Sequence, residues 1–223
     1  MGGMQANYVQ RLRLTFRKEG PTRFIGHLDL ARTLERSLNR ARIPMSYSQG
    51  FNSRPRMQMA AALPLGYTSA CELADIWLKE AMEPETAREQ IMARMAPGID
   101  VWEVQEVGLK EPALQTRTLD STYEVTLLEP VDTAVLQSRI ADLLAAETLL
   151  RERRDKPYDL RPLLLDLRLR QPITDLTQLD MRLMLKEGQT GRPDEVLDAL
   201  EFDPLAARIH RTAITLAPLE EAG

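Results

Sequence analysis

Residues 23–66 read RFIGHLDLARTLERSLNRARIPMSYSQGFNSRPRMQMAAALPLG and predict one helix followed by an unusual loop. Apolar residues recur at three- and four-residue steps from Leu28 to Ala41, which is typical of an amphipathic helix over 28–42. Pro44 ends this helix because the residue before a proline is pushed out of helical geometry. The loop at 47–56 combines glycine, asparagine, proline and arginine, which a simple turn does not require.

Working outward, the first sixty residues are basic within an acidic chain. They hold 11 Lys+Arg against 3 Asp+Glu, a balance of +8, and since the 223 residues sum to −4, residues 61–223 carry −12. This imbalance favours an anionic partner for the first third of the chain, with RNA as the first candidate. No DNA partner is predicted.

The predicted helix carries Arg32, Arg36 and Arg40 four residues apart, so they form one charged ridge. Like charges at this spacing cost roughly 0.2–0.5 kcal/mol per pair in an isolated helix, a cost that a bound anion would offset. A solvated face, on which nearby carboxylates pair with the arginines, is the alternative. A preceding strand over 9–18 is predicted to expose Arg11, Arg13 and Arg17 on its polar face.

The loop predicts further contacts. Gly50 permits a positive φ and Asn52 tolerates it, so exposed backbone amides would form a nest for phosphate. Phe51 would stack on a base, or alternatively pack into the core and anchor a long hairpin. The nucleic-acid-binding candidates are therefore Arg11, Arg13, Arg32, Arg36, Arg40, Phe51, Asn52, Arg54 and Arg56.

His27 is the catalytic candidate, because an imidazole at a helix N-terminus tends to be neutral and can act as a base. A capping or packing role is the alternative.

The single cysteine, Cys71, excludes a disulfide, a zinc knuckle and an iron–sulfur ligand set within this chain, and no cofactor is expected. No apolar run approaches the roughly 18 residues of a membrane span, and the chain start lacks a signal sequence, so a cytoplasmic location is expected.

The order strand, helix, strands, helix, strand is predicted twice, which indicates an α+β fold of two tandem ferredoxin-like (βαββαβ) domains with antiparallel sheets. The domains are placed at residues 1–110 and 118–223, because residues 108–121 are polar and aperiodic. In the second half, Asp132 is a predicted N-cap. The predicted elements are strands at 9–18, 45–48, 57–61, 72–79, 101–107, 123–127, 159–170, 178–186 and 211–217, and helices at 28–42, 85–96, 133–146 and 193–200.

Two further stretches of the second half carry possible chemistry. The turn from Gly188 to Pro193 leads into a helix, so its amides would either cradle a phosphate or serve only as a tight turn. A basic stretch from Arg151 to Arg161 is interrupted by acids, which indicates a charge-laced hairpin or a docking surface for a partner enzyme.

Several blocks carry a family resemblance: GHLDLARTLER, SQGFNSRPR and LPLG in the first half, then YDLRPLLLDLRL (158–169) and GQTGRPDEVLDAL (188–200). Together they resemble the radical-SAM-linked protein family, a bacterial domain of unknown function. Ser53 departs from the family pattern, in which a second proline is expected. The resemblance implies a partner, a cobalamin-binding radical SAM enzyme encoded beside or fused to such domains, and it does not imply an activity.

These observations lead to three hypotheses. The first is a non-catalytic module that holds an RNA, such as transfer or ribosomal RNA, for modification by a radical SAM partner. The second is a metal-independent endoribonuclease that uses His27 as general base. The third is a protein-binding adaptor whose basic face docks on an acidic partner.

Overall fold

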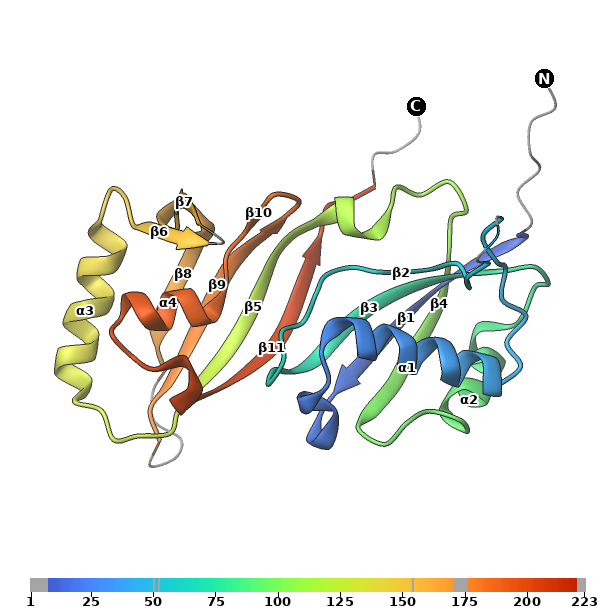
Figure 1. The fold of residues 1–223 in the computed structure, drawn as a ribbon, viewed down its shortest axis with the longest axis horizontal. Helices are drawn as coiled ribbons and strands as arrows, with labels where there is room; N and C mark the ends of the chain where they lie inside the picture. Colours follow the sequence, from blue (N-terminus) through green and yellow to red (C-terminus); the bar gives the residue numbers. More distant parts are fainter. Residues whose placement is uncertain (1–7, 50, 52, 154, 171–175, 220–223) are drawn as a thin grey trace, which may run out of the picture. The chain divides into compact units, whose positions relative to one another are not determined.

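The computed structural model describes residues 8–49, 51, 53–153, 155–170 and 176–219. The chain forms two compact units, each a mixture of helices and an antiparallel sheet (Figure 1), so the predicted α+β class is confirmed. The first unit comprises the described residues up to Arg117 together with Pro218 and Leu219, and the second spans Thr118–Ala217. No helix in the described part of the chain is long and apolar enough to cross a membrane.

The first unit has four strands in the order β4-β1-β3-β2, and all neighbouring pairs are antiparallel. In chain order its elements are β1 (Gln10–Lys18), the 3-10 helix η1 (Gly20–Phe24), α1 (His27–Arg40), β2 (Met57–Met59), β3 (Thr68–Leu78), α2 (Pro84–Met92), β4 (Ile99–Val107) and the 3-10 helix η2 (Leu114–Arg117).

The core of the first unit lies between one face of this sheet and α1. Alternation along β1 places Leu12, Leu14 and Phe16 on that face, and each is at most 1% exposed. Leu30, Leu34, Leu38 and other apolar residues of α1 meet them at the three- and four-residue spacing of a helix face. Complete burial of one such side chain contributes about 1.5–3 kcal/mol, so this layer dominates the stability of the unit.

Most of the polar face of β1 is also buried, which corrects the prediction that Arg11 and Arg13 are presented to solvent, whereas Arg17 is exposed. Arg11 and Arg13 are 1% and 5% exposed, and both bond the fully buried carboxylate of Asp75 on β3. The Arg13 guanidinium also contacts Glu111 at 3.3 Å, and Arg117 donates to the same Glu111 carboxylate at 2.7 Å. Residues 108–117 therefore line this face with the acceptors that the two arginines need.

The main sheet of the second unit follows the strand order β11-β5-β9-β8, again with every neighbouring pair antiparallel. Its elements are β5 (Thr118–Leu127), α3 (Thr133–Ala145), β6 (Leu150–Arg153), β7 (Lys156–Asp159), the 3-10 helix η3 (Arg161–Leu163), β8 (Leu164–Leu169), β9 (Gln178–Lys186), β10 (Gln189–Thr190), α4 (Pro193–Ala199), the 3-10 helix η4 (Pro204–Ala206) and β11 (Ala207–Leu216). β6 and β7 form a separate hairpin, and the short β10 pairs with β9.

Two local predictions in the second unit have different outcomes. The Asp132 carboxylate accepts from the backbone N–H groups of Ala134 and Val135 at 2.9 and 3.2 Å, which confirms it as the N-cap of α3. The single strand predicted over 159–170 is wrong, because the chain turns after Asp159 through η3 before β8 begins. The Asp159 carboxylate accepts from the N–H of Arg161 at 2.9 Å and thereby stabilises this turn.

Asp120 joins three strands of the second unit. Its carboxylate accepts from the Arg182 guanidinium at 2.9 and 2.8 Å and from the Thr215 hydroxyl at 2.9 Å. The hydrogen bonds from Arg182 hold the pKa of Asp120 below its ordinary value. The pair therefore stabilises the fold most where Asp120 is ionised.

Replacement of Asp75 by asparagine is expected to lower the free energy of unfolding of the first unit by about 3–5 kcal/mol, because two buried guanidinium groups lose their shared anion. Urea unfolding of the full chain measures the change. Asp100→Asn is the control, since the Asp100–Arg17 pair is half-exposed at 4.0 Å and should cost at most about 1 kcal/mol. Equal losses for the two variants would contradict the role given to Asp75.

The contribution of Arg182 to stability is expected to depend on pH. The folded pKa of Asp120 is depressed, so its stabilisation is present above the unfolded value, near pH 4, and is lost as the pH falls through the folded pKa. The difference in unfolding free energy between wild type and Arg182→Gln should therefore shrink when the pH is lowered from 7 towards 3. A difference that stays constant over this range would refute the assignment.

Candidate nucleic-acid interface

The unusual loop forms a hairpin over residues 46–56. The Arg56 N–H donates to the Ser46 carbonyl oxygen and the Ser48 N–H donates to the Arg54 carbonyl oxygen, both at 2.8 Å. The Ser53 hydroxyl donates to the Ser48 carbonyl oxygen at 2.8 Å. The residue that departs from the family pattern thus supplies a hydrogen bond across the hairpin.

Two neighbouring elements hold this 46–56 hairpin. The Tyr47 hydroxyl donates to the Asn39 side-chain oxygen at 3.0 Å, which connects the hairpin to the last turn of α1. The Ser46 N–H donates to the Trp77 carbonyl oxygen at 2.7 Å and the Trp77 N–H to the Arg56 carbonyl oxygen at 3.2 Å, which extends the pairing to β3. The hairpin is therefore built onto the same unit as α1, from whose C-terminal end it continues (Figure 1).

Phe51 lies near the tip of the 46–56 hairpin with its side chain fully in solvent, at 108% relative exposure. The alternative in which Phe51 packs into the core is therefore wrong. Gly50 and Asn52, on either side of it, lie outside the described residues. An aromatic ring held out on a hairpin in this way is available for stacking on a base.

The three arginines of α1 have different environments. The Arg36 side chain is exposed and forms no ion pair with the described residues. Arg32 is also exposed and has only a long contact with Asp29, at 3.4 Å. The Arg40 guanidinium instead donates to the carbonyl oxygen of Arg94 at 3.0 Å, which connects α1 to the end of α2. Within the described part of the chain, Arg36 is therefore the arginine of the ridge without a partner, and Arg32 has only its exposed pair with Asp29.

The two arginines of the hairpin also differ. The Arg54 side chain is exposed, and its guanidinium has no partner in the described part of the chain. The Arg56 guanidinium lies over the ring of Tyr8, 5.2 Å from its centroid, and its Nε is buried. Arg56 therefore packs against the unit, whereas Arg54 remains available to a ligand.

Arg11 and Arg13 do not belong to this surface. Both are buried and bonded to Asp75, so the prediction that they contact a nucleic acid is wrong. The sequence contained a signal of this outcome, since Asp75 is the only charged residue in the run ADIWL of the facing strand. A single carboxylate within such a run needs a cation inside the fold.

An exposed apolar cluster lies beside the start of α1, and the sequence pattern did not predict it. Phe24, Leu28 and Leu65 are 66%, 71% and 64% exposed, and the assignment of Leu28 to the buried face of the helix is wrong. The Arg23 guanidinium covers one side of the Phe24 ring at 4.5 Å, and the Gly66 N–H donates to the Arg23 carbonyl oxygen.

His27 is the first residue of α1 and is half-buried. Its role as a general base stays a prediction. Among the residues that the structure describes, no group of three or more histidine, cysteine or acidic side chains is placed to hold a metal ion.

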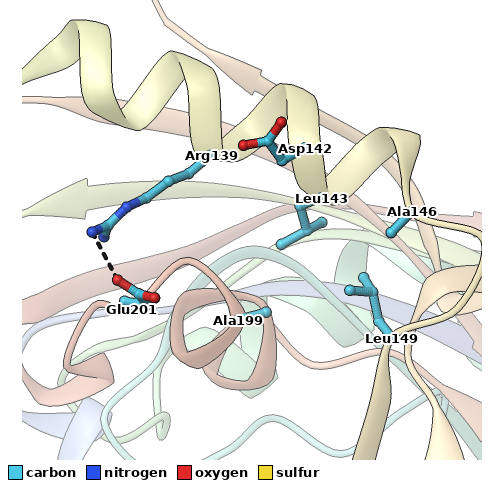
Figure 2. A pocket seen from close by; sticks show the side chains of 7 residues that line it. All are labelled: Arg139, Asp142, Leu143, Ala146, Leu149, Ala199 and Glu201. Atoms are coloured by element: carbon cyan, nitrogen blue, oxygen red, sulfur yellow. Dashed lines mark ion pairs between the residues drawn. The ribbon is translucent and has the colours of Figure 1, made fainter.

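The second unit offers a pocket between α3 and α4 of about 250 Å³ (Figure 2). Leu143, Ala146 and Leu149 give it an apolar lining. The Arg139 guanidinium pairs with the Glu201 carboxylate at 2.7 Å and donates to a backbone carbonyl, so it is not free for an anionic ligand.

One family model matches residues 11–193, and its description is "Uncharacterized protein conserved in bacteria (DUF2344)". No curated protein matches the chain.

Three solved structures are similar in fold. They are a Cbf5-Nop10-Gar1 complex (7% identity, TM-score 0.49), the archaeal box H/ACA sRNP Nop10-Cbf5 complex (9%, 0.45) and an H/ACA RNP bound to a substrate RNA containing 2′-deoxyuridine (9%, 0.46). The matches cover 91%, 96% and 95% of this chain but 48%, 50% and 49% of the other chains, so this chain spans about half their length. At these scores the likeness carries no argument about function.

Replacement of Phe51 by alanine is expected to leave the free energy of unfolding within about 0.5 kcal/mol of wild type, because the ring makes no core contact. The matched control is Phe16→Ala, which empties a fully buried site and should cost about 3–5 kcal/mol. Urea unfolding of both variants measures the difference. A loss of more than about 1.5 kcal/mol for Phe51→Ala would show that the ring packs against the unit.

Proposed function

The chain belongs to the family of uncharacterised proteins conserved in bacteria whose model matches residues 11–193, and we propose that it is a non-catalytic RNA-binding module. The contacts are assigned to the exposed face of α1 and to the 46–56 hairpin of the first unit. One observation carries the proposal: Phe51, a fully exposed aromatic ring, lies on a hairpin that is hydrogen-bonded to the helix carrying the exposed Arg32 and Arg36.

The distribution of positive charge supports an anionic ligand at this place. Several cations of the first sixty residues are used within the fold, as Arg11 and Arg13 are by Asp75 and Arg40 is by the carbonyl of Arg94. Arg36 and Arg54 are exposed without partners in the described part of the chain. Guanidinium groups left in solvent attract phosphate oxygens, to which they can donate two hydrogen bonds each.

The exposed ring supports single-stranded RNA over a regular duplex. A base stacks on an aromatic side chain only when it is splayed out of a helix, as in loops and bulges. Stacking of this kind contributes about 1–3 kcal/mol per base and tolerates any sequence. Phosphate contacts from Arg36 and Arg54 would then position a strand whose base rests on Phe51.

A radical SAM enzyme remains the proposed partner. This part of the proposal rests on the sequence resemblance of the blocks at 26–66, 158–169 and 188–200. The module would present an RNA, such as transfer or ribosomal RNA, and the partner would carry the reaction. We also propose that each unit is ferredoxin-like, which is supported by the strand orders β4-β1-β3-β2 and β11-β5-β9-β8.

The double variant Arg36→Ala/Arg54→Ala is expected to bind a single-stranded RNA at least about tenfold more weakly than wild type. The log–log dependence of affinity on salt should also flatten by about 0.7 for each phosphate that the variant no longer neutralises. Fluorescence anisotropy with a labelled single-stranded RNA oligonucleotide, measured at several salt concentrations, gives both quantities. Phe51→Ala should weaken binding with little change in the salt slope.

The matched control is Arg94→Ala/Lys110→Ala, which removes the same charge from exposed positions of the same unit. It should retain more affinity than the Arg36/Arg54 variant. If both double variants lose affinity equally, binding follows net charge alone and the proposed contacts are rejected. If wild type binds no RNA at low salt, the function itself is rejected.

A further inference from the structure

The exposed apolar cluster of Phe24, Leu28 and Leu65 lies outside the RNA contacts of the proposed function. It is found at the N-terminal end of α1, whereas the 46–56 hairpin follows the C-terminal end of the same helix (Figure 1). Phe24 belongs to η1, immediately before α1, and two thirds of its surface is exposed. Large apolar side chains exposed beside one another indicate an interaction site rather than a part of the core.

The helix η1 is firmly attached to the unit, so the Phe24 ring has a fixed place. The buried Thr22 hydroxyl lies within hydrogen-bond distance of two carbonyl oxygens, those of Glu19 at 2.6 Å and Gly98 at 3.0 Å. The Glu19 N–H also donates to the Gly98 carbonyl oxygen, at 2.8 Å. A Cβ added at Gly98 would lie 2.6 Å from the Glu19 carbonyl oxygen, so the two segments approach as closely as glycine allows. A ring held in this way loses little freedom when it binds a ligand.

A cation already covers one side of the Phe24 ring. The Arg23 guanidinium lies 4.5 Å from the ring centroid, and within the described part of the chain no carboxylate pairs with it. The ring is still 66% exposed, so it is not enclosed between the arginine and the fold. A base can therefore stack on the ring while the neighbouring guanidinium attracts a phosphate.

The exposed face of α1 connects this ring with the 46–56 hairpin. Leu28, Arg32 and Arg36 follow one another at four-residue steps, so they form one row along the helix, and all three are exposed. The row ends near Asn39, whose side chain accepts from the hydroxyl of Tyr47 in the hairpin. Aromatic residues thus lie at both ends of a row that contains two exposed arginines.

The charge along this path is positive. Residues 20–56 hold seven arginines against two carboxylates, those of Asp29 and Glu35, and residues 36–71 contain neither aspartate nor glutamate. The Asp29 carboxylate pairs with Arg32 at 3.4 Å, and both side chains are exposed. Because an exposed pair of this kind contributes little, phosphate oxygens can compete for the arginine. Positive charge interleaved with aromatic rings is the arrangement that binds the backbone and bases of a single strand.

We propose that Phe24 is a second stacking platform and that one RNA strand runs along α1 from Phe24 to the 46–56 hairpin. This inference rests on the proposed RNA-binding function and specifies its ligand. One base would stack on Phe24 and another on Phe51, and phosphates between them would meet Arg32 and Arg36. The ligand is a single-stranded segment and not a regular duplex, because the bases of a duplex are not available to both rings.

The length of α1 sets the length of strand that this path requires. Its 14 residues span about 21 Å at 1.5 Å per residue. A stacked strand of twelve nucleotides, at about 3.4 Å each, covers this path, whereas a trinucleotide covers about half of it. Only the longer strand can therefore contact both rings at once.

Fluorescence anisotropy of the full chain with a labelled dodecauridylate, which forms no duplex, tests the proposal. Phe24→Ala is expected to raise the Kd at least about fivefold. The log–log salt slope should stay unchanged, because a stacking contact and not a phosphate contact is lost. Phe24→Leu keeps an apolar side chain but no ring, so it should lose as much affinity as Phe24→Ala. Phe24→Trp should bind at least as tightly as wild type.

Two comparisons separate this path from a general effect of the substitution. A labelled triuridylate can reach only one ring, so its Kd should be nearly the same for wild type and Phe24→Ala. Leu109→Ala removes an exposed apolar side chain from the segment at 108–117, on the other side of the sheet from α1, and should leave both Kd values unchanged. Each variant should unfold in urea as wild type does, because the altered side chains are exposed.

Several results would overturn the second platform while the proposed function stands. The first is a dodecauridylate Kd that does not respond to Phe24→Ala although Arg36→Ala/Arg54→Ala weakens binding. The second is wild-type affinity for Phe24→Leu, which would show an apolar contact and not stacking. The third is an equal loss for the trinucleotide, which would contradict the path along α1.

Two further outcomes concern other ligands. If Phe24→Ala keeps its RNA affinity but loses a protein that wild type retains after nuclease treatment, the apolar cluster is a protein-docking site and the second platform is rejected. If wild type does not bind the dodecauridylate at low salt, the RNA function and the second platform are rejected together.

Discussion

The buried carboxylate of Asp75 is the constraint on which the first unit depends. It lies on β3 opposite Arg13 and bonds two guanidinium groups, those of Arg11 and Arg13. Removal of a charged group from water costs several kcal/mol unless its hydrogen bonds are replaced. The carbonyl oxygens of Glu111 and Pro112 and the Glu111 carboxylate provide the remaining acceptors. Hydrogen bonds from these two arginines thus hold the segment at 108–117 against the polar face of β1.

This arrangement decides where the free positive charge lies. β1 pairs with β3 and β4 on its two edges, and along most of its length both faces are buried, so Arg11 and Arg13 must be neutralised inside the unit, whereas Arg17 is exposed. α1 covers the opposite face and turns its own arginines outward, where water solvates them at no comparable cost. Apart from Arg17, the exposed arginines of the first sixty residues therefore lie outside the sheet, and they include Arg32 and Arg36 of α1 and Arg54 of the 46–56 hairpin.

The second unit also pairs arginines with carboxylates inside the fold. The Arg182 and Arg153 guanidinium groups pair with Asp120 and Glu195 and thereby join strands to neighbouring segments. Such charge-assisted pairs fix geometry because the planar guanidinium matches the carboxylate. In the first unit, the charges available to a ligand are those that the fold does not use.

Much of the architecture follows from local patterns in the sequence. Alternation at Leu12, Leu14 and Phe16 predicted a strand, because this signal acts between residues close in the chain. For the same reason the recurrence from Leu28 to Ala41 predicted helix α1, although Leu30 and not Leu28 lies on its buried face, and Asp132 predicted the N-cap of α3. The functions of the arginines could not be read in this way. In the sequence, Arg11 and Arg36 are indistinguishable cations. Only the tertiary structure brings Asp75, 64 residues away, into contact with Arg11 and leaves Arg36 exposed to water. Local periodicity determined the elements, whereas pairing between distant residues decided which charges are buried and which can meet a ligand.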